Sequence, residues 1–140
     1  MGAVPAEALG VAGLGGVSRV YIQIVIWNLE KSDATVESLR EYLRDYAVDA
    51  FSTLRGMRMK TWFADAKKGY WGAVYLWDGV NMQNPLSVSK AIELIGYPPT
   101  STSVFAVEAI AEGVSAIESF KGIGRAFEEV SAPDPAGESA

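Results

Sequence analysis

The hydrophobic pattern of the chain predicts four β-strands. Residues 20–28 (VYIQIVIWN) are apolar at both parities, which is typical of a central strand buried on both faces. Residues 57–64 and 70–77 predict two further strands, and the short polar segment DAKKG between them predicts a hairpin loop. Residues 103–112 predict the fourth strand.

Helical spacing appears between these strands and after the last one. Between residues 35 and 54, apolar residues recur every three or four positions and charged residues occupy the opposite face, which predicts one amphipathic helix of about five turns. Residues 87–95 predict a short helix, which Gly96 and the two prolines after Tyr97 terminate. Residues 115–130 predict a last helix, although its glycines lower the helix propensity.

The resulting order, β-α-β-β-α-β with a C-terminal helix, is that of the split βαβ motif. It predicts an α+β domain of ferredoxin-like fold, in which a four-stranded antiparallel sheet carries both helices on one face. The other face would be bare in a monomer, yet Ile22, Ile24 and Ile26 alternate with apolar residues of the opposite parity. Because a bare apolar face needs a cover, the sequence predicts a homodimer that packs sheet against sheet.

Composition suggests where this domain begins and ends. Residues 1–18 are rich in glycine and alanine and lack the basic segment of a signal peptide, so we expect a flexible extension. The alternative is that the gene prediction is too long and that the native protein begins near Val17 or Val20. Residues 128–140 predict a disordered acidic tail. The 140-residue chain therefore predicts one domain, at residues 19–127.

Charge argues against binding to nucleic acid. The net charge is −5, but five of the 17 acidic residues lie outside residues 8–127, which leaves 12 acidic residues there against 12 lysines and arginines. Such a neutral domain predicts no basic face for a phosphate backbone. No segment approaches the about 20 apolar residues of a membrane-spanning helix, so no membrane partner is expected.

The absence of two residue types restricts the chemistry. The chain has no cysteine, which excludes disulfides and thiolate sites and fits a reducing compartment, so we expect a cytoplasmic protein. It has no histidine either, which removes the usual general base, the Ser-His-Asp triad and most zinc sites. We therefore expect no metal, and any reaction must use carboxylates, Lys, Arg, Tyr, Trp or Asn.

Aromatic and cationic residues gather on the predicted hairpin. Arg58, Lys60 and Trp62 occupy alternate positions of the first strand, and Trp71, Tyr75 and Trp77 occupy alternate positions of the second. If the hairpin register brings these two sets together, all six side chains lie on one face. The opposite face would then carry Met57, Met59, Phe63, Tyr70, Val74 and Leu76. Trp and Tyr suit a pocket for a planar organic ligand, but they are equally suited to packing a dimer interface, and the sequence does not separate these two interpretations.

Two amides interrupt the apolar first strand. Gln23 and Asn28 need hydrogen-bond partners if they are buried. A structural hydrogen bond is the expected role of each, with a role in binding as the alternative.

Four stretches stand out by their order and spacing: IQI followed by WN at 22–28, G followed by KTW at 56–62, GAVYLW at 72–77 and SVFAV at 103–107. In these stretches the chain resembles the YdhR-like mono-oxygenases of the dimeric α+β barrel superfamily, and the resemblance covers residues 22–117. It implies a homodimer with a pocket in each subunit. It also implies oxygenation of an aromatic or polyketide-like small molecule without metal, haem or flavin. Haem-degrading relatives hold iron through a histidine, which this chain lacks.

The resemblance also suggests roles for individual residues. Such chemistry needs a protein that binds a deprotonated substrate, stabilises its anion and excludes water. Lys60 or Arg58 would stabilise a phenolate, and Asn28, Gln23 or the N–H of Trp62 would hold the developing oxygen anion. The substrate would lie against Trp27, Trp71, Tyr75 and Trp77. A non-catalytic dimeric binding protein and a cyclase or isomerase would need the same pocket, so the sequence leaves these alternatives open.

Overall fold

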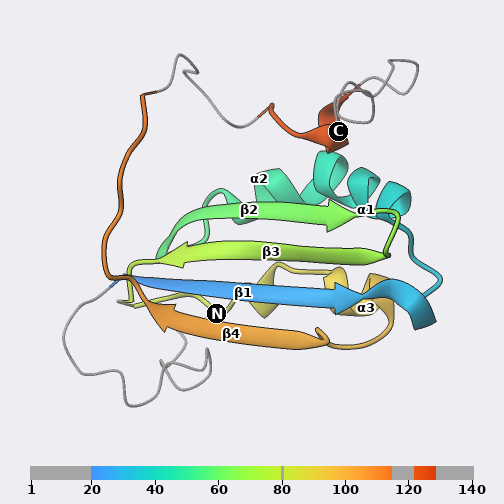
Figure 1. Cartoon of the computed structure of the whole chain (residues 1–140), viewed down its shortest axis with the longest axis horizontal. Helices are drawn as coiled ribbons and strands as arrows, with labels where there is room; N and C mark the ends of the chain where they lie inside the picture. The colour runs from blue at the N-terminus through green and yellow to red at the C-terminus, as the bar shows by residue number, and fades with distance from the viewer. Residues whose placement is uncertain (1–19, 80, 115–121, 129–140) are drawn as a thin grey trace.

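The computed structural model describes residues 20–79, 81–114 and 122–128 of the chain. In these residues, strands β1 (Tyr21–Asn28), β2 (Met57–Asp65), β3 (Tyr70–Trp77) and β4 (Ser101–Ala106) form one sheet in the order β2-β3-β1-β4 (Figure 1). Each pair of neighbouring strands is antiparallel. The predicted α+β class and the antiparallel four-stranded sheet are therefore confirmed.

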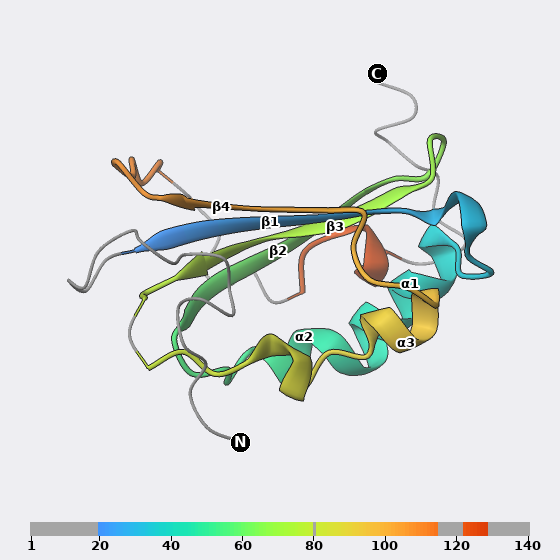
Figure 2. The ribbon, with the colours of Figure 1, turned by 90° about the horizontal axis from the view of Figure 1, so that it is seen from below.

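The predicted long helix is one helical segment with an irregular centre. Helix α1 (Val36–Tyr42) passes through a π-helical turn (Leu43–Ala47) into helix α2 (Val48–Phe51). Thr35 begins α1 with a capping box, because its hydroxyl accepts a hydrogen bond from the Ser38 backbone N–H while the Ser38 side chain bonds the Thr35 N–H in return. Helix α3 (Ala91–Ile95) lies beside this segment, and all three helices lie on one side of the sheet (Figure 2).

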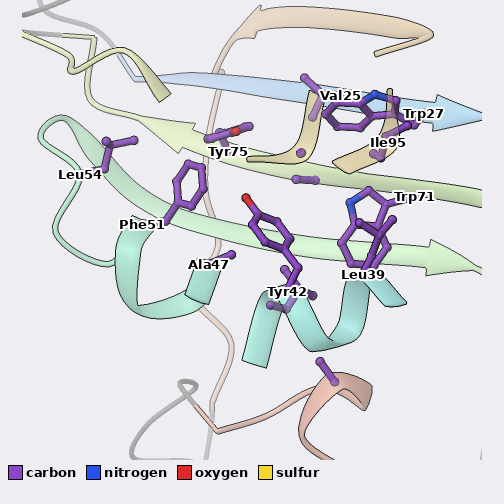
Figure 3. Close-up of a cluster of buried hydrophobic side chains, with 14 of the residues drawn as sticks. Val25, Trp27, Leu39, Tyr42, Ala47, Phe51, Leu54, Trp71, Tyr75 and Ile95 are labelled. Atoms are coloured by element: carbon purple, nitrogen blue, oxygen red, sulfur yellow. The ribbon is translucent and has the colours of Figure 1, made fainter. Parts of the chain in front are cut away.

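The side chains that point from the sheet toward the helices form the core. Burial alternates along β1, and its fully buried positions share a face with Trp71, Ala73, Tyr75 and Trp77 of β3. Leu39, Ala47 and Phe51 meet them from the helical segment, as Figure 3 shows. This face therefore carries all four tryptophans of the chain.

The other face of the sheet is apolar and is left open by the helices. It carries Ile22, Ile24 and Ile26 of β1, which the sheet register aligns with residues of β3 and β4. Two apolar side chains at its edges are more than half exposed, Met59 at 54% and Phe105 at 55%. The residues that the structure describes thus leave open the apolar face that the sequence predicts.

Three of the predicted boundaries were wrong. The second helix begins at Ala91, because residues 85–87 form a 3₁₀ turn and the Ser89 hydroxyl accepts a hydrogen bond from the Ala91 N–H. Strand β4 spans residues 101–106 and not 103–112. Ala106 pairs with Tyr21, the first residue of β1, and one further backbone hydrogen bond joins the Val107 N–H to the Val20 oxygen.

The third error concerns the predicted last helix. Where the structure describes that stretch, at residues 122–128, it has only a 3₁₀ turn (Arg125–Phe127). Gly124 precedes this turn with φ of 120°, a backbone angle outside the helical region. The rest of the predicted helix, together with the predicted N-terminal extension and most of the acidic tail, lies outside the described residues.

Candidate functional site

A lysine enclosed by aromatic rings lies between β2 and the helical segment. Lys60 of β2 is directly opposite Tyr75 of β3, and its ammonium nitrogen Nζ donates a hydrogen bond to the Tyr75 hydroxyl at 2.7 Å. The same nitrogen lies 3.4 Å from the ring centre of Phe51, 4.3 Å from that of Tyr75 and 4.5 Å from that of Trp62. We call Lys60, Phe51, Trp62 and Tyr75 the lysine cluster.

The rings of the cluster also contact one another. Phe51 meets Trp62 edge to face at 5.6 Å between ring centres and meets Tyr75 in the same way at 6.3 Å. On the other side, Tyr75 stacks on Trp77 at 5.2 Å. Figure 3 shows Phe51 and Tyr42 pointing from the helical segment toward Tyr75 on the sheet. The amine is therefore packed directly against π faces instead of being surrounded by water.

This environment changes the acid-base properties of the cluster. Burial lowers the pKa of Lys60 to about 6, because the charged ammonium loses its hydration. Burial raises the pKa of Tyr75 above its ordinary value, and the nearby Tyr42 adds to this effect. The ring faces oppose the change at Lys60, since each attracts an ammonium by about 0.5–2 kcal/mol. Desolvation corresponds to about 6 kcal/mol for the fall from 10.5 to about 6, at about 1.4 kcal/mol per pKa unit, and the three rings together oppose it by about 1.5–6 kcal/mol.

Gln23 supports the cluster from the centre of the sheet. It lies opposite Tyr75 on β1, and its side-chain oxygen accepts a hydrogen bond from the indole N–H of Trp77 at 2.9 Å. Both side chains are buried, so this bond satisfies an indole donor that water does not reach. The structural role expected for Gln23 is therefore present, and it holds Trp77 beneath Tyr75.

Arg58 does not lie with the other predicted residues. The β2–β3 register shifts between Met57 and Met59, which leaves Arg58 as the extra residue of a bulge with an exposed side chain. The same shift places Met57 opposite Trp77, on the core face, and not with Met59 on the open face as predicted. An exposed arginine at this position offers no desolvated charge to a ligand beside Lys60.

Asn28 is also remote from the cluster. It is the last residue of β1, five positions beyond Gln23, or about 17 Å along the strand, and it has the parity of the open face. Its side-chain oxygen accepts a hydrogen bond from the Glu30 N–H and begins the 3₁₀ turn that follows β1. This local hydrogen bond is the structural role that the sequence predicts for Asn28. Its distance from Lys60 excludes a catalytic role beside that residue in the same subunit.

Trp27 and Trp71 form a separate group at the same end of the sheet as Asn28. They lie opposite each other on β1 and β3, and Figure 3 shows them beside Leu39 and Ile95. The Trp27 indole N–H donates to the backbone oxygen of Tyr97 at 2.9 Å. The predicted site residues thus divide into the neighbourhood of Lys60, with Trp62, Tyr75, Trp77 and Gln23, and a second group that packs the far end of the core.

Phe51 and Tyr42 belong to this region but were missed in the sequence. Both lie on the helical segment, and the apolar spacing that defined its buried face omitted them. A signal for Phe51 was present, because it follows Leu43 and Ala47 at intervals of four residues. The helix therefore supplies the ring nearest to the lysine, at a position that strand parity alone does not reveal.

A surface hollow elsewhere is a weaker candidate for a binding site. It has a volume of about 520 Å³ and lies between the loop after β1 and the β2–β3 hairpin. Its charged lining residues Glu30, Glu37, Lys67 and Lys68 are all exposed. Such a site offers solvated charges of both signs, whereas ligand sites are typically concave and largely apolar with a few fixed polar groups.

Two further findings concern the described part of the chain. It contains no group of three or more acidic side chains placed to hold a metal ion. None of its helices is long and apolar enough to cross a membrane.

No protein-family model matches this chain, and no curated protein matches it significantly either. The resemblance to the YdhR-like mono-oxygenases therefore stays a hypothesis that rests on the stretches given above.

Proposed function

We propose that this protein is a homodimeric, cofactor-independent mono-oxygenase of ferredoxin-like fold that acts on an acidic aromatic small molecule. The observation that carries the proposal is the amine of Lys60, which has no acidic partner among the described salt bridges and lies against three aromatic rings. With its pKa lowered to about 6, Lys60 would be mostly neutral at pH 7 and able to accept a proton from a phenol or an activated CH₂ group.

The chemistry that follows needs no cofactor if the substrate supplies the electrons. In an anthrone, for example, loss of a proton to Lys60 gives an anion that donates electrons to O₂. One oxygen atom becomes the new carbonyl group, and the other leaves as water with the two hydrogens of the CH₂ group. Lys60 in its protonated form then lies beside the substrate anion and stabilises it, while the rings exclude water.

Access to Lys60 would come from the edge of the sheet. The strand order places β2 at this edge, and both Lys60 and Trp62 are only half-buried there. Since the rings contact the amine directly, a planar ligand would enter by displacing Trp62, the ring that the edge strand itself carries. This makes Trp62 a binding residue and Lys60 the catalytic residue of the proposal.

The open face of the sheet supports the dimeric part of the proposal. It presents Ile22, Ile24, Ile26, Met59, Phe63, Val74, Leu76 and Phe105 to one side of the molecule. Contiguous apolar surface of this kind marks an interaction site, and a second copy with the same face is the simplest cover. The strand order β2-β3-β1-β4 with helices on one side supports the ferredoxin-like assignment.

Oxygen consumption measured against a panel of anthrones and hydroquinones tests this function. We expect turnover by the wild-type chain and a fall of at least about tenfold in Lys60→Met and in Trp62→Phe, with thermal melts that show a folded protein. Lys90→Met is the matched control, because Lys90 also lies over a ring, that of Tyr46 at 4.1 Å, but is exposed. Equal oxygen consumption in wild type and Lys60→Met would refute the assignment.

A further inference from the structure

The lysine cluster contains a second chemical possibility that does not involve oxygen. Lys60 Nζ and the Tyr75 hydroxyl are in direct hydrogen-bond contact, at 2.7 Å, on neighbouring strands of a rigid sheet. A neutral amine is a nucleophile, and a phenol is an acid that can donate its proton to a leaving group. The two groups that imine formation requires are therefore already adjacent.

We propose that Lys60 forms an imine with the carbonyl carbon of an aromatic aldehyde or ketone, and that Tyr75 supplies the proton for the departing water. This inference depends on the same lysine as the proposed function but on neither O₂ nor a substrate that can be oxidised. The aromatic class of the carbonyl compound follows from Phe51 and Trp62, whose rings flank the amine and would lie against a planar, conjugated imine.

The step balances without an oxidant or a reductant. The lone pair of Nζ attacks the carbonyl carbon, and a proton moves from nitrogen to oxygen to give a carbinolamine. The Tyr75 hydroxyl then protonates the carbinolamine oxygen, a molecule of water leaves, and a C=N bond forms. Tyr75 recovers its proton from the nitrogen, so the net change is amine and carbonyl compound to imine and water.

The surroundings of Lys60 favour this role in two ways. Burial lowers the pKa of the amine, so that a nucleophilic fraction exists at neutral pH. Burial also raises the pKa of Tyr75, which keeps its hydroxyl protonated but makes it a weaker acid, so its part in the step rests on its 2.7 Å contact with Nζ. Water is also partly excluded by the rings, which slows hydrolysis of the imine once it has formed. The exposed lysines Lys31, Lys67 and Lys68 lack such surroundings.

Reductive trapping in the absence of oxygen tests the proposal. The full chain would be incubated under argon at pH 7 with 2-naphthaldehyde and sodium cyanoborohydride, and the modified lysines would be located by peptide mass mapping. We expect Lys60 to be modified at least about tenfold faster than Lys31, Lys67 or Lys68, which serve as internal controls in the same molecule. Modification of Lys60 at the rate of the exposed lysines, or more slowly, would overturn the inference.

A variant separates the role of Tyr75 from that of Lys60. Tyr75→Phe keeps the ring stack on Trp77 but removes the acid, so we expect trapping at Lys60 to slow by at least about tenfold while the exposed lysines react as before. An unchanged rate at Lys60 in a folded variant would contradict the role of Tyr75. Trapping at Lys60 without oxygen consumption would refute the mono-oxygenase function and support imine formation. Oxygen consumption without trapping at Lys60 would refute imine formation and support the mono-oxygenase function.

Discussion

Replacing Lys60 with methionine should change how the stability of the protein depends on pH. In the folded chain, burial lowers the pKa of Lys60 to about 6 from its ordinary value of 10.5. Between these two pH values the unfolded chain holds the lysine proton and the folded chain does not. The unfolded state therefore binds more protons, and the free energy of unfolding contributed by Lys60 rises with pH in this window.

The expected magnitude follows from the same two values. Each pH unit inside the window adds up to about 1.4 kcal/mol to the free energy of unfolding of the wild type relative to Lys60→Met, or about 2–3 kcal/mol from pH 7 to pH 9. Lys60→Met should be the more stable protein at pH 7, because methionine keeps the apolar stem without the cost of burying an amine. Tyr75 and Tyr42 do not disturb the comparison, since the wild type and the variant share both and burial raises the pKa of each in the folded chain.

Urea denaturation followed by tryptophan fluorescence at several values from pH 6.5 to 9.5 measures this difference. The wild type and Lys60→Met share every other titrating group, so subtracting their free energies of unfolding isolates Lys60. Lys90→Met, which removes an exposed lysine, is the matched control. A difference between wild type and Lys60→Met that does not change with pH would show that folded Lys60 keeps its proton, and it would refute the base and nucleophile roles together.

Three other substitutions test the packing around the site and the open face. Gly72→Ala should lower the free energy of unfolding by about 1–3 kcal/mol in urea denaturation, because the new methyl group would clash with the backbone oxygen of Val25, and a neutral effect would contradict this close approach. Gln23→Leu should cost about 1–3 kcal/mol by leaving the indole N–H of Trp77 without its acceptor, whereas an unchanged chemical-denaturation midpoint would show another acceptor. The wild type should be a dimer by light scattering and Ile24→Lys a monomer, and a wild-type monomer would refute the dimer proposal.

The sheet was predictable because its signals are local. The run of apolar residues along β1 and the short polar loop between β2 and β3 are each recognised from a few neighbouring residues. Parity placed Lys60 and Tyr75 on one face of the predicted hairpin, and the structure pairs them directly opposite each other. Elements whose limits depend on a distant partner were less predictable. Strand β4 ends at Ala106 because β1 begins at Tyr21, and the apolar residues after Ala106 contain no sign of this.

The site was predictable only in part, for two physical reasons. A bulge adds one residue to β2 at Arg58, which reverses the parity of Met57 and removes Arg58 from the aromatic face, and nothing in the local sequence marks that position. The π-helical turn between α1 and α2 changes which residues of the helical segment face the sheet. Phe51, the ring nearest to Lys60, lies just after this turn at the same four-residue spacing as Leu43 and Ala47, but the apolar face predicted through Ala50 and Leu54 omitted it.

The protonation state of Lys60 decides between a structural and a chemical interpretation of the lysine cluster. If the amine is charged in the folded protein, attraction to Phe51, Trp62 and Tyr75 is a sufficient reason for its position, and the cluster is packing with one buried cation. If the amine is neutral, it gains little from the ring faces and still costs more than an apolar side chain of the same length. A neutral lysine at position 60 therefore requires a reason outside stability, and a buried amine held against a phenol has that reason in proton transfer or bond formation with a ligand.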